Sequence, residues 1–202
     1  MQWQRLDRDN SVKVIDSVKS AENAGMFSVA TSEVKRARLP FFTDYYLYKV
    51  TNFASLPSFS FQYLSDGTFF HYLDGTETPI YAVNDKGSIS LNAANVLMYL
   101  EFFFEQAGDE DGDIMLINNP HDMPLLDSLD MDVYQAVFSQ HKPAAVEYDE
   151  QTERYLVTAD LYKDTQLIRA KIEISRRGRV KITNQEMIMH QMSGANYTEN
   201  AY

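Results

Sequence analysis

The sequence predicts an α+β fold: a mainly antiparallel, curved sheet built from two meanders, packed on one long apolar helix, plus a helix at the N-terminus. Residues 41–89 and 143–190 each contain short runs of aromatic and β-branched residues separated by turn residues. Residues 92–107 between them have the apolar spacing of a helix. Helices and strands do not alternate regularly, which favours antiparallel pairing. We therefore predict a single domain over residues 1–192 and a flexible tail over 193–202.

The N-terminal part begins with a helix predicted over residues 9–24. Val14, Ile15 and Val18 have helical spacing, and Gly25 is typical of a helix C-cap. The elements expected next are a short strand at 26–31, a basic connector at 34–40 and an aromatic-rich strand at 41–50.

The clearest local pattern is a pair of linked hairpins. Phe59, Phe61 and Tyr63 alternate with polar residues, and Asp66 and Gly67 form a dipeptide typical of a tight turn. The rest of this predicted meander is a return strand at 68–73, a turn at Asp74-Gly75 and a strand at 80–83.

The long helix predicted over residues 92–107 has apolar side chains in two arcs. At about 100° per residue, the main arc contains Ala93, Val96, Leu97, Leu100, Phe104 and Ala107. Met98 and Phe102 lie in a second arc on nearly the opposite side. Because a surface helix needs only one apolar stripe, either another lobe of the chain or a second subunit covers this arc. We predict a homodimer with Met98 and Phe102 at its interface.

The C-terminal part alternates turns with strands. Ile168, Ala170, Ile172 and Ile174 alternate strictly with polar residues, which is typical of a strand with one buried face. The predicted elements are a strand at 113–118, a helix at 130–141 and four strands at 144–149, 154–162, 166–175 and 179–189.

Composition excludes several classes of function. The net charge of −11 repels phosphate backbones, so nucleic-acid binding is not expected. The chain has no cysteine, which removes disulfides and thiol chemistry. The longest apolar run, residues 96–104, is about half of a membrane span, and the first residues lack the apolar segment of a secretory signal. We expect a cytoplasmic protein without membrane partners.

The acidic stretch GDEDGD, residues 108–113, has aspartates at the spacing of calcium ligands. Starting from Asp109, however, the position that requires glycine is Ile114, and the position of the bidentate glutamate is Pro120. The four histidines also lack the spacing of a metal-binding pair. The sequence therefore predicts an acidic turn here, and neither a metal nor a cofactor.

Two sets of residues are candidates for a site. His121 and Asp122 in a proline-bounded loop, and Glu101 and Glu105 on the long helix, are candidate acid–base groups. The alternatives are an exposed loop histidine and a solvent-facing stripe of the helix. The second set is cationic and is a candidate binding ribbon: Arg169, Lys171, Arg176, Arg177, Arg179 and Lys181. Its alternative is edge protection, or pairing with the chain's own acidic residues.

The function that these patterns favour is a non-catalytic cytoplasmic binding or protein-interaction domain, with a protein or a small molecule as its ligand. One alternative is a small enzyme that uses a sheet-lined pocket with His, Asp and Glu acid–base groups. Another is an acidic inhibitor of a basic partner protein, which rests on net charge alone.

Overall fold

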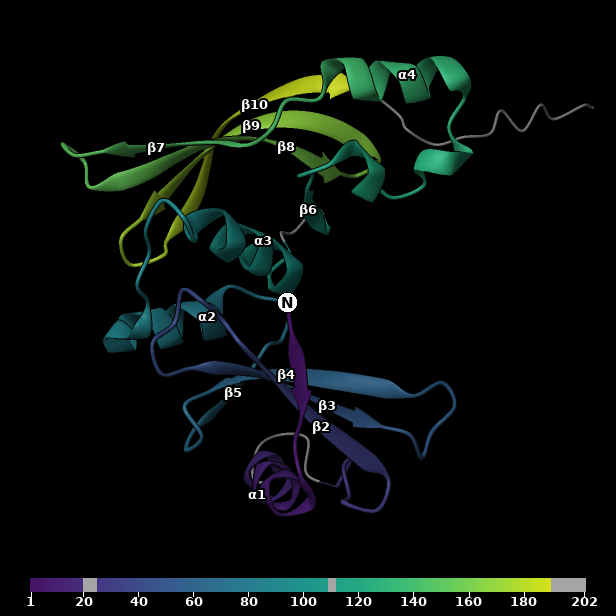
Figure 1. Cartoon of the computed structure of the whole chain (residues 1–202), viewed down its shortest axis with the longest axis vertical. Helices are drawn as coiled ribbons and strands as arrows, with labels where there is room; N and C mark the ends of the chain where they lie inside the picture. The colour runs from purple at the N-terminus through teal and green to yellow at the C-terminus, as the bar shows by residue number, and fades with distance from the viewer. Residues whose placement is uncertain (20–24, 109–111, 190–202) are drawn as a thin grey trace, which may run out of the picture. The chain divides into compact units, whose positions relative to one another are not determined.

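The computed structural model describes residues 1–19, 25–108 and 112–189 (Figure 1). These residues form four α-helices and two antiparallel sheets, which confirms the predicted α+β class. The chain divides into two compact units, residues 1–99 and 100–202, and each is described separately. Two compact units can still fold cooperatively as one domain, so the single domain over residues 1–192 stays a prediction. The predicted tail over 193–202 lies outside the described residues.

The N-terminal unit contains a meander of five strands in the order β1-β2-β3-β4-β5. Its helices are α1 (Arg8–Lys19) and α2 (Thr78–Val83), and α2 continues into a π-helical turn at Asn84–Ser88. Its strands are β1 (Trp3–Arg5), β2 (Ser32–Arg38), β3 (Tyr46–Asn52), β4 (Phe59–Ser65) and β5 (Phe70–Tyr72).

Helix α1 packs on one face of this sheet, as its spacing predicts. Asp7 precedes the helix and accepts the backbone N–H of Asn10 at 2.8 Å, which satisfies one of the free donors of the first turn. The predicted extension of the helix to residue 24 lies outside the described residues. The side chains that form this core are Val14, Ile15, Val18, Phe27, Val34, Tyr48, Val50 and Tyr63.

Two expectations about strands were wrong in this unit. Residues 34–40, predicted as a basic connector, contain most of β2, because Val34 and Ala37 are buried on opposite faces and Lys35 pairs with Glu33 at 2.8 Å. Residues 26–31, predicted as a strand, form turns and irregular structure. The strand expected at 41–50 begins only at Tyr46.

The second predicted hairpin is also wrong, because residues 80–83 belong to helix α2. Pro79 lies in the first turn of α2, where proline has no hydrogen bond to lose. Ile80 and Val83 are three residues apart and are both fully buried, so one helical face carries the apolar side chains. The first hairpin is confirmed: β4 and β5 pair antiparallel across Gly67, whose φ is 94°.

Helix α3 (Val96–Gln106) spans the division between the two units. Asn92 accepts the backbone N–H of Ala94 at 2.8 Å and so caps the turn that leads into the helix. The predicted helix at 92–107 is therefore confirmed, with a later start. No helix in the described part of the chain is long and apolar enough to cross a membrane.

The C-terminal unit contains the second sheet, in the order β10-β9-β8-β6, with β7 also paired to β8. Its strands are β6 (Ile114–Leu116), β7 (Ala145–Asp149), β8 (Arg154–Lys163), β9 (Gln166–Ser175) and β10 (Val180–Met189). All five were predicted. The alternating residues Ile168, Ala170, Ile172 and Ile174 are buried, as expected.

Helix α4 (Met131–Gln140) and two 3₁₀ turns, Pro120–Asp122 and Leu126–Ser128, complete this unit. They pack on one end of the second sheet through an apolar cluster formed by Ile117, Met123, Leu126, Val137 and Leu167. This cluster fixes the loop that carries His121 and Asp122.

Candidate functional site

The C-terminal unit has a cavity of about 400 Å³ with acidic walls. It is formed by the second half of α3, by β6 and its preceding residue, and by the first 3₁₀ turn. Its lining residues are Glu101, Phe104, Glu105, Asp113, Ile114, Met115, Leu116, Asn118 and Asp122. None of these residues is Lys, Arg or His, so the walls combine negative charge with apolar surface.

The local structure explains how the carboxyl groups meet. Glu101 and Glu105 are one helical turn apart and therefore share a face of α3. Asn119 Oδ1 accepts the backbone N–H of His121 at 3.0 Å, and the Asn119 carbonyl accepts that of Asp122 at 2.9 Å. This tight turn brings Asp122 to the cavity, where Asp113 joins it from the start of β6.

The two glutamates influence each other. Partial desolvation raises the pKa of Glu105 above its usual range, and repulsion from the Glu101 carboxylate raises it further. Asn118 Nδ2 donates to Glu101 Oε1 at 3.4 Å. Both carboxylates remain accessible to solvent, so screening limits the shift. The cavity thus concentrates like charges that a cationic group would relieve.

The structure brings together three of the four predicted acid–base residues. Glu101, Glu105 and Asp122 line the same cavity, whereas His121 does not line it and packs its ring against Phe138, with centroids 4.8 Å apart. Asp113 is an addition, because the sequence analysis placed it in an acidic turn.

Asp109 and Asp111, in the stretch that the sequence analysis rejected as a calcium loop, lie outside the described residues. Among the residues that are described, no three acidic or histidine side chains are arranged to hold a metal ion.

The cationic candidates differ in their surroundings, and the binding ribbon stays a prediction. Arg169 donates to both carboxylate oxygens of Asp160 and to the Gln140 carbonyl, so it is held inside the unit. Arg176 lies seven strand residues away, about 23 Å at 3.3 Å per residue. There it donates to the Tyr148 hydroxyl at 2.8 Å.

The remaining cationic candidates lie at different places on the second sheet. Lys171 is exposed and lines a separate groove on the solvent-facing side of the sheet, together with Glu173. Arg177 and Arg179 lie in or next to the β9–β10 turn, and Lys181 follows in β10 opposite Glu173. Their role in binding stays a prediction.

The two predicted interface residues differ in exposure. Met98 is 50% exposed, whereas Phe102 is only 2% exposed within the chain. Phe102 is therefore covered without a second copy, and Met98 alone offers apolar surface to a partner.

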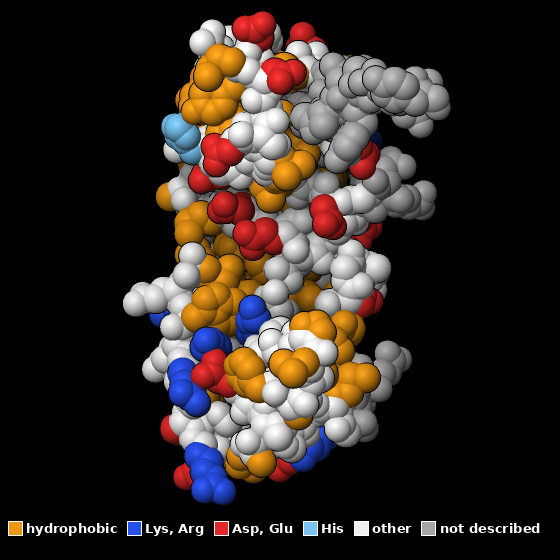
Figure 2. All heavy atoms as spheres, turned by 90° about the vertical axis from the view of Figure 1, so that its right-hand side faces the viewer, with side chains coloured by type: hydrophobic (Ala, Val, Ile, Leu, Met, Phe, Trp, Pro, Cys, Tyr) orange, Lys and Arg blue, Asp and Glu red, His pale blue; other side chains and the backbone are white. Residues whose placement is uncertain are grey.

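The charge of the chain belongs almost entirely to its C-terminal unit. Residues 1–99 contain nine Lys and Arg against ten Asp and Glu, a net charge of −1, and residues 100–202 contain nine against nineteen, a net charge of −10. Figure 2 shows Asp and Glu side chains gathered on one face of the C-terminal unit, and Lys and Arg side chains on the N-terminal unit.

Comparison of the chain with protein-family models, with curated proteins and with solved structures gives no significant match in any of the three. The site must therefore be interpreted from its own chemistry.

Proposed function

We propose that this chain is a non-catalytic, cytoplasmic binding protein that receives a cationic side chain of a basic partner protein in its acidic cavity. The observation that carries the proposal is the convergence of Glu101, Glu105, Asp113 and Asp122 on one cavity whose lining includes no cation. This combines the protein-interaction function expected from the sequence with the basic partner that the sequence analysis gave as an alternative.

Charge favours a cationic group over a neutral one. Two opposite unit charges 4 Å apart attract with about 1 kcal/mol in water and about 4 kcal/mol near a protein surface. Partial desolvation is the main cause of the raised pKa of Glu105, and the charge of Glu101 adds to it; a Lys or Arg side chain would relieve this repulsion.

The apolar part of the lining suits the stem of such a side chain. Lys and Arg bury their methylene groups on apolar surface while the charged end remains in a polar environment. Phe104, Ile114 and Leu116 supply that surface, and the 42% exposed Met115 extends it. The volume of about 400 Å³ lies in the range of ligand cavities, about 300–1,000 Å³.

A protein partner is favoured over a small amine by the charge around the cavity. The net charge of −10 over residues 100–202 extends well beyond the cavity lining. A field of this kind accelerates association with a basic surface and weakens as salt is added.

Isothermal titration calorimetry with a short arginine-rich peptide tests this proposal. We expect saturable binding that weakens at least about tenfold in the variant Glu101→Gln/Glu105→Gln, which corresponds to about 1.4 kcal/mol. The matched control is Glu147→Gln/Glu150→Gln, which removes two exposed charges outside the cavity. Equal losses in both variants would show that only diffuse charge attracts the peptide.

A small enzyme remains the second candidate, because one observation favours it. Glu105 has a raised pKa and lies beside a second carboxylate, an arrangement used in general acid–base catalysis. Mass spectrometry of the peptide after long incubation separates the two functions. Under the binding proposal the peptide is recovered unchanged, whereas a product that disappears with Glu105→Gln would establish catalysis.

The homodimer also stays a proposal, with Met98 as its described apolar contact. Light scattering at tens of micromolar chain tests it, and Met98→Glu should shift the mass toward the monomer without unfolding the chain. A monomeric wild type would rule out the homodimer but would not affect the proposed function of the acidic cavity.

A further inference from the structure

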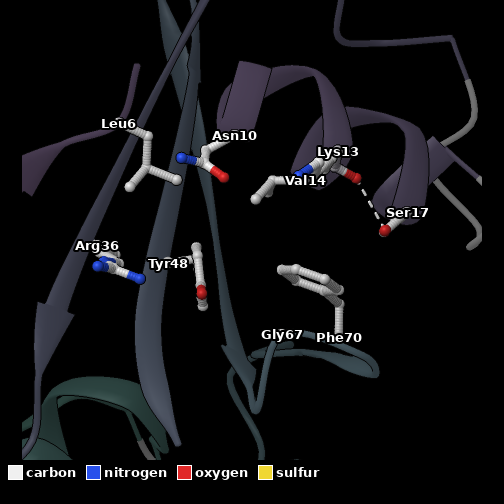
Figure 3. Close-up of a pocket in the computed structure, with 9 residues that line it drawn as sticks. All are labelled: Leu6, Asn10, Lys13, Val14, Ser17, Arg36, Tyr48, Gly67 and Phe70. Atoms are coloured by element: carbon white, nitrogen blue, oxygen red, sulfur yellow. Dashed lines mark hydrogen bonds between the residues drawn. The ribbon is translucent and has the colours of Figure 1, made fainter. Parts of the chain in front are cut away.

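The N-terminal unit contains a second cavity, of about 170 Å³, between helix α1 and the sheet (Figure 3). Asn10 and Lys13 line it from α1, Arg36 and Tyr48 from β2 and β3, and Phe70 from the start of β5. Sequence reasoning could not find this group, because its members are far apart in the chain.

The lining of this cavity has the opposite charge to the acidic cavity. Lys13 and Arg36 are its charged residues, and no carboxylate lines it. Within the described chain, neither cation has a carboxylate at salt-bridge distance. Two hydrogen bonds from Asn10, from its backbone N–H and its Nδ2 and each 2.8 Å long, lower the pKa of Asp7, and the charge of nearby Lys13 lowers it further.

Arg36 has an aromatic neighbour beside the cavity. Its guanidinium carbon lies 5.0 Å from the centroid of the Tyr46 ring, a cation–π contact. The guanidinium carries five N–H donors that can bind an anion. Figure 3 shows the ends of Arg36, Asn10 and Tyr48 around the same space.

Size and charge select the ligand. The cavity volume of about 170 Å³ is below the roughly 300–1,000 Å³ of cavities for drug-sized ligands, so it suits a small group. Two cations match the charge of a phosphate monoester, about −1.5 to −2 at pH 7, better than that of a carboxylate. Arg is also well suited to a planar pair of hydrogen bonds with phosphate oxygens.

We propose that this cavity binds a phosphate monoester group, with Arg36 and Lys13 as its ligands and the rest of the molecule outside the mouth. The proposal concerns the N-terminal unit alone and does not rest on the proposed function of the acidic cavity.

NMR titration of the ¹⁵N-labelled full chain with phosphoserine, inorganic phosphate and acetate tests the proposal. We expect saturable shifts of amides near residues 10–17, 36 and 67–70, with a Kd of about 1 mM or below for phosphoserine. Arg36→Gln and Lys13→Gln should each weaken binding at least tenfold, and Arg36→Lys, which keeps the charge, should weaken it less. Acetate should give no saturation.

Matched controls separate a site from general attraction. Arg38→Gln removes a charge two residues along the same strand and outside the cavity, and Lys19→Gln does the same on α1. Both should bind as the wild type does. Inorganic phosphate that binds as tightly as phosphoserine would assign the site to the phosphate group alone.

Three results would overturn the proposal: shifts that do not saturate, equal losses in the control variants, or exclusion of phosphoserine by a site that accepts inorganic phosphate. Thermal unfolding checks that each variant folds. If Arg36→Gln does not fold, Lys13→Gln still tests the proposal. Lys13 is exposed, so its replacement leaves the packing of the sheet unchanged.

Discussion

Arg169 holds both oxygens of the buried Asp160: Nε lies 2.8 Å from Oδ1, and Nη2 lies 3.1 Å from Oδ2. The Lys142 backbone N–H donates to Oδ2 at 2.9 Å, and Arg169 Nη2 also donates to the Gln140 carbonyl at 2.8 Å. This pair therefore attaches the C-terminal end of α4 to β8 and β9. Since α4 packs against the loop that carries Asp122, the pair helps to position one wall of the acidic cavity.

Breaking this pair should strongly destabilise the C-terminal unit. Asp160→Ala leaves Arg169 without its carboxylate. Arg169→Gln leaves a fully buried carboxylate that keeps only the Lys142 backbone N–H and the His141 ring, whose Nδ1 lies 3.1 Å from Oδ2. Removing one partner of a buried pair costs about 3–5 kcal/mol. Urea unfolding should show a loss of this size for each variant. Arg177→Gln, at the exposed β9–β10 turn, should change stability by less than about 0.5 kcal/mol.

Glu105→Gln should stabilise the chain at neutral pH and leave it unchanged at low pH. Folding raises the pKa of Glu105 above the ordinary value of 4.5, so the folded state disfavours its ionisation. The contribution of protonated Glu105 to the stability of the folded chain is fully present below pH 4.5. It is lost as the pH rises through the folded-state pKa. Because the group is accessible to solvent, we expect a gain in Tm of only about 1–3 °C at pH 7. A gain that persists at pH 3.5 would contradict this assignment.

Phe102 and Met98, one turn apart on α3, should respond differently to truncation. Phe102→Ala should cost about 3–5 kcal/mol, because Phe102 is 2% exposed. Met98→Ala should cost less than about 1 kcal/mol, since half of its side chain is in solvent. Chemical denaturation of the two variants measures both. A small effect at Phe102 would show that its cover is weakly packed.

The hydroxyl of Tyr99 should contribute to the stability of the N-terminal unit. Asn84 Nδ2 donates to Tyr99 Oη at 2.9 Å, and both residues are buried. Tyr99→Phe leaves that donor without its acceptor and should cost about 1–3 kcal/mol in thermal or urea unfolding. The control Tyr134→Phe removes a hydroxyl from a half-buried ring and should have little effect.

The sequence predicted the C-terminal sheet because strict alternation, as in residues 168–174, has one structural interpretation. It failed at residues 80–83, because a run of four apolar residues fits a strand or a buried helical turn equally well. It also failed at β2, where adjacent cations concealed Val34 and Ala37, which are buried on opposite faces of the sheet. Neither error could be corrected without knowing what packs against these residues.

Parts of the candidate site could be predicted from the sequence. The spacing of Glu101 and Glu105 indicated a shared face, and the position of Asp122 in a proline-bounded loop indicated a functional segment. Their meeting with Asp113 depends on how the loop after β6 folds back, which is a tertiary event. The same reasoning explains why Lys13 and Arg36 were not recognised as a pair.

We expect a cationic group to bind in the cavity formed by α3, β6 and the first 3₁₀ turn. Titration of the ¹⁵N-labelled chain with arginine methyl ester, a small cation, tests this location most directly by NMR. The shifts should saturate, should be concentrated at residues 101–106 and 113–122, and should be lost in Glu101→Gln/Glu105→Gln. Shifts centred on the equally acidic segment 147–153, or spread over the whole C-terminal unit without saturation, would contradict this expectation.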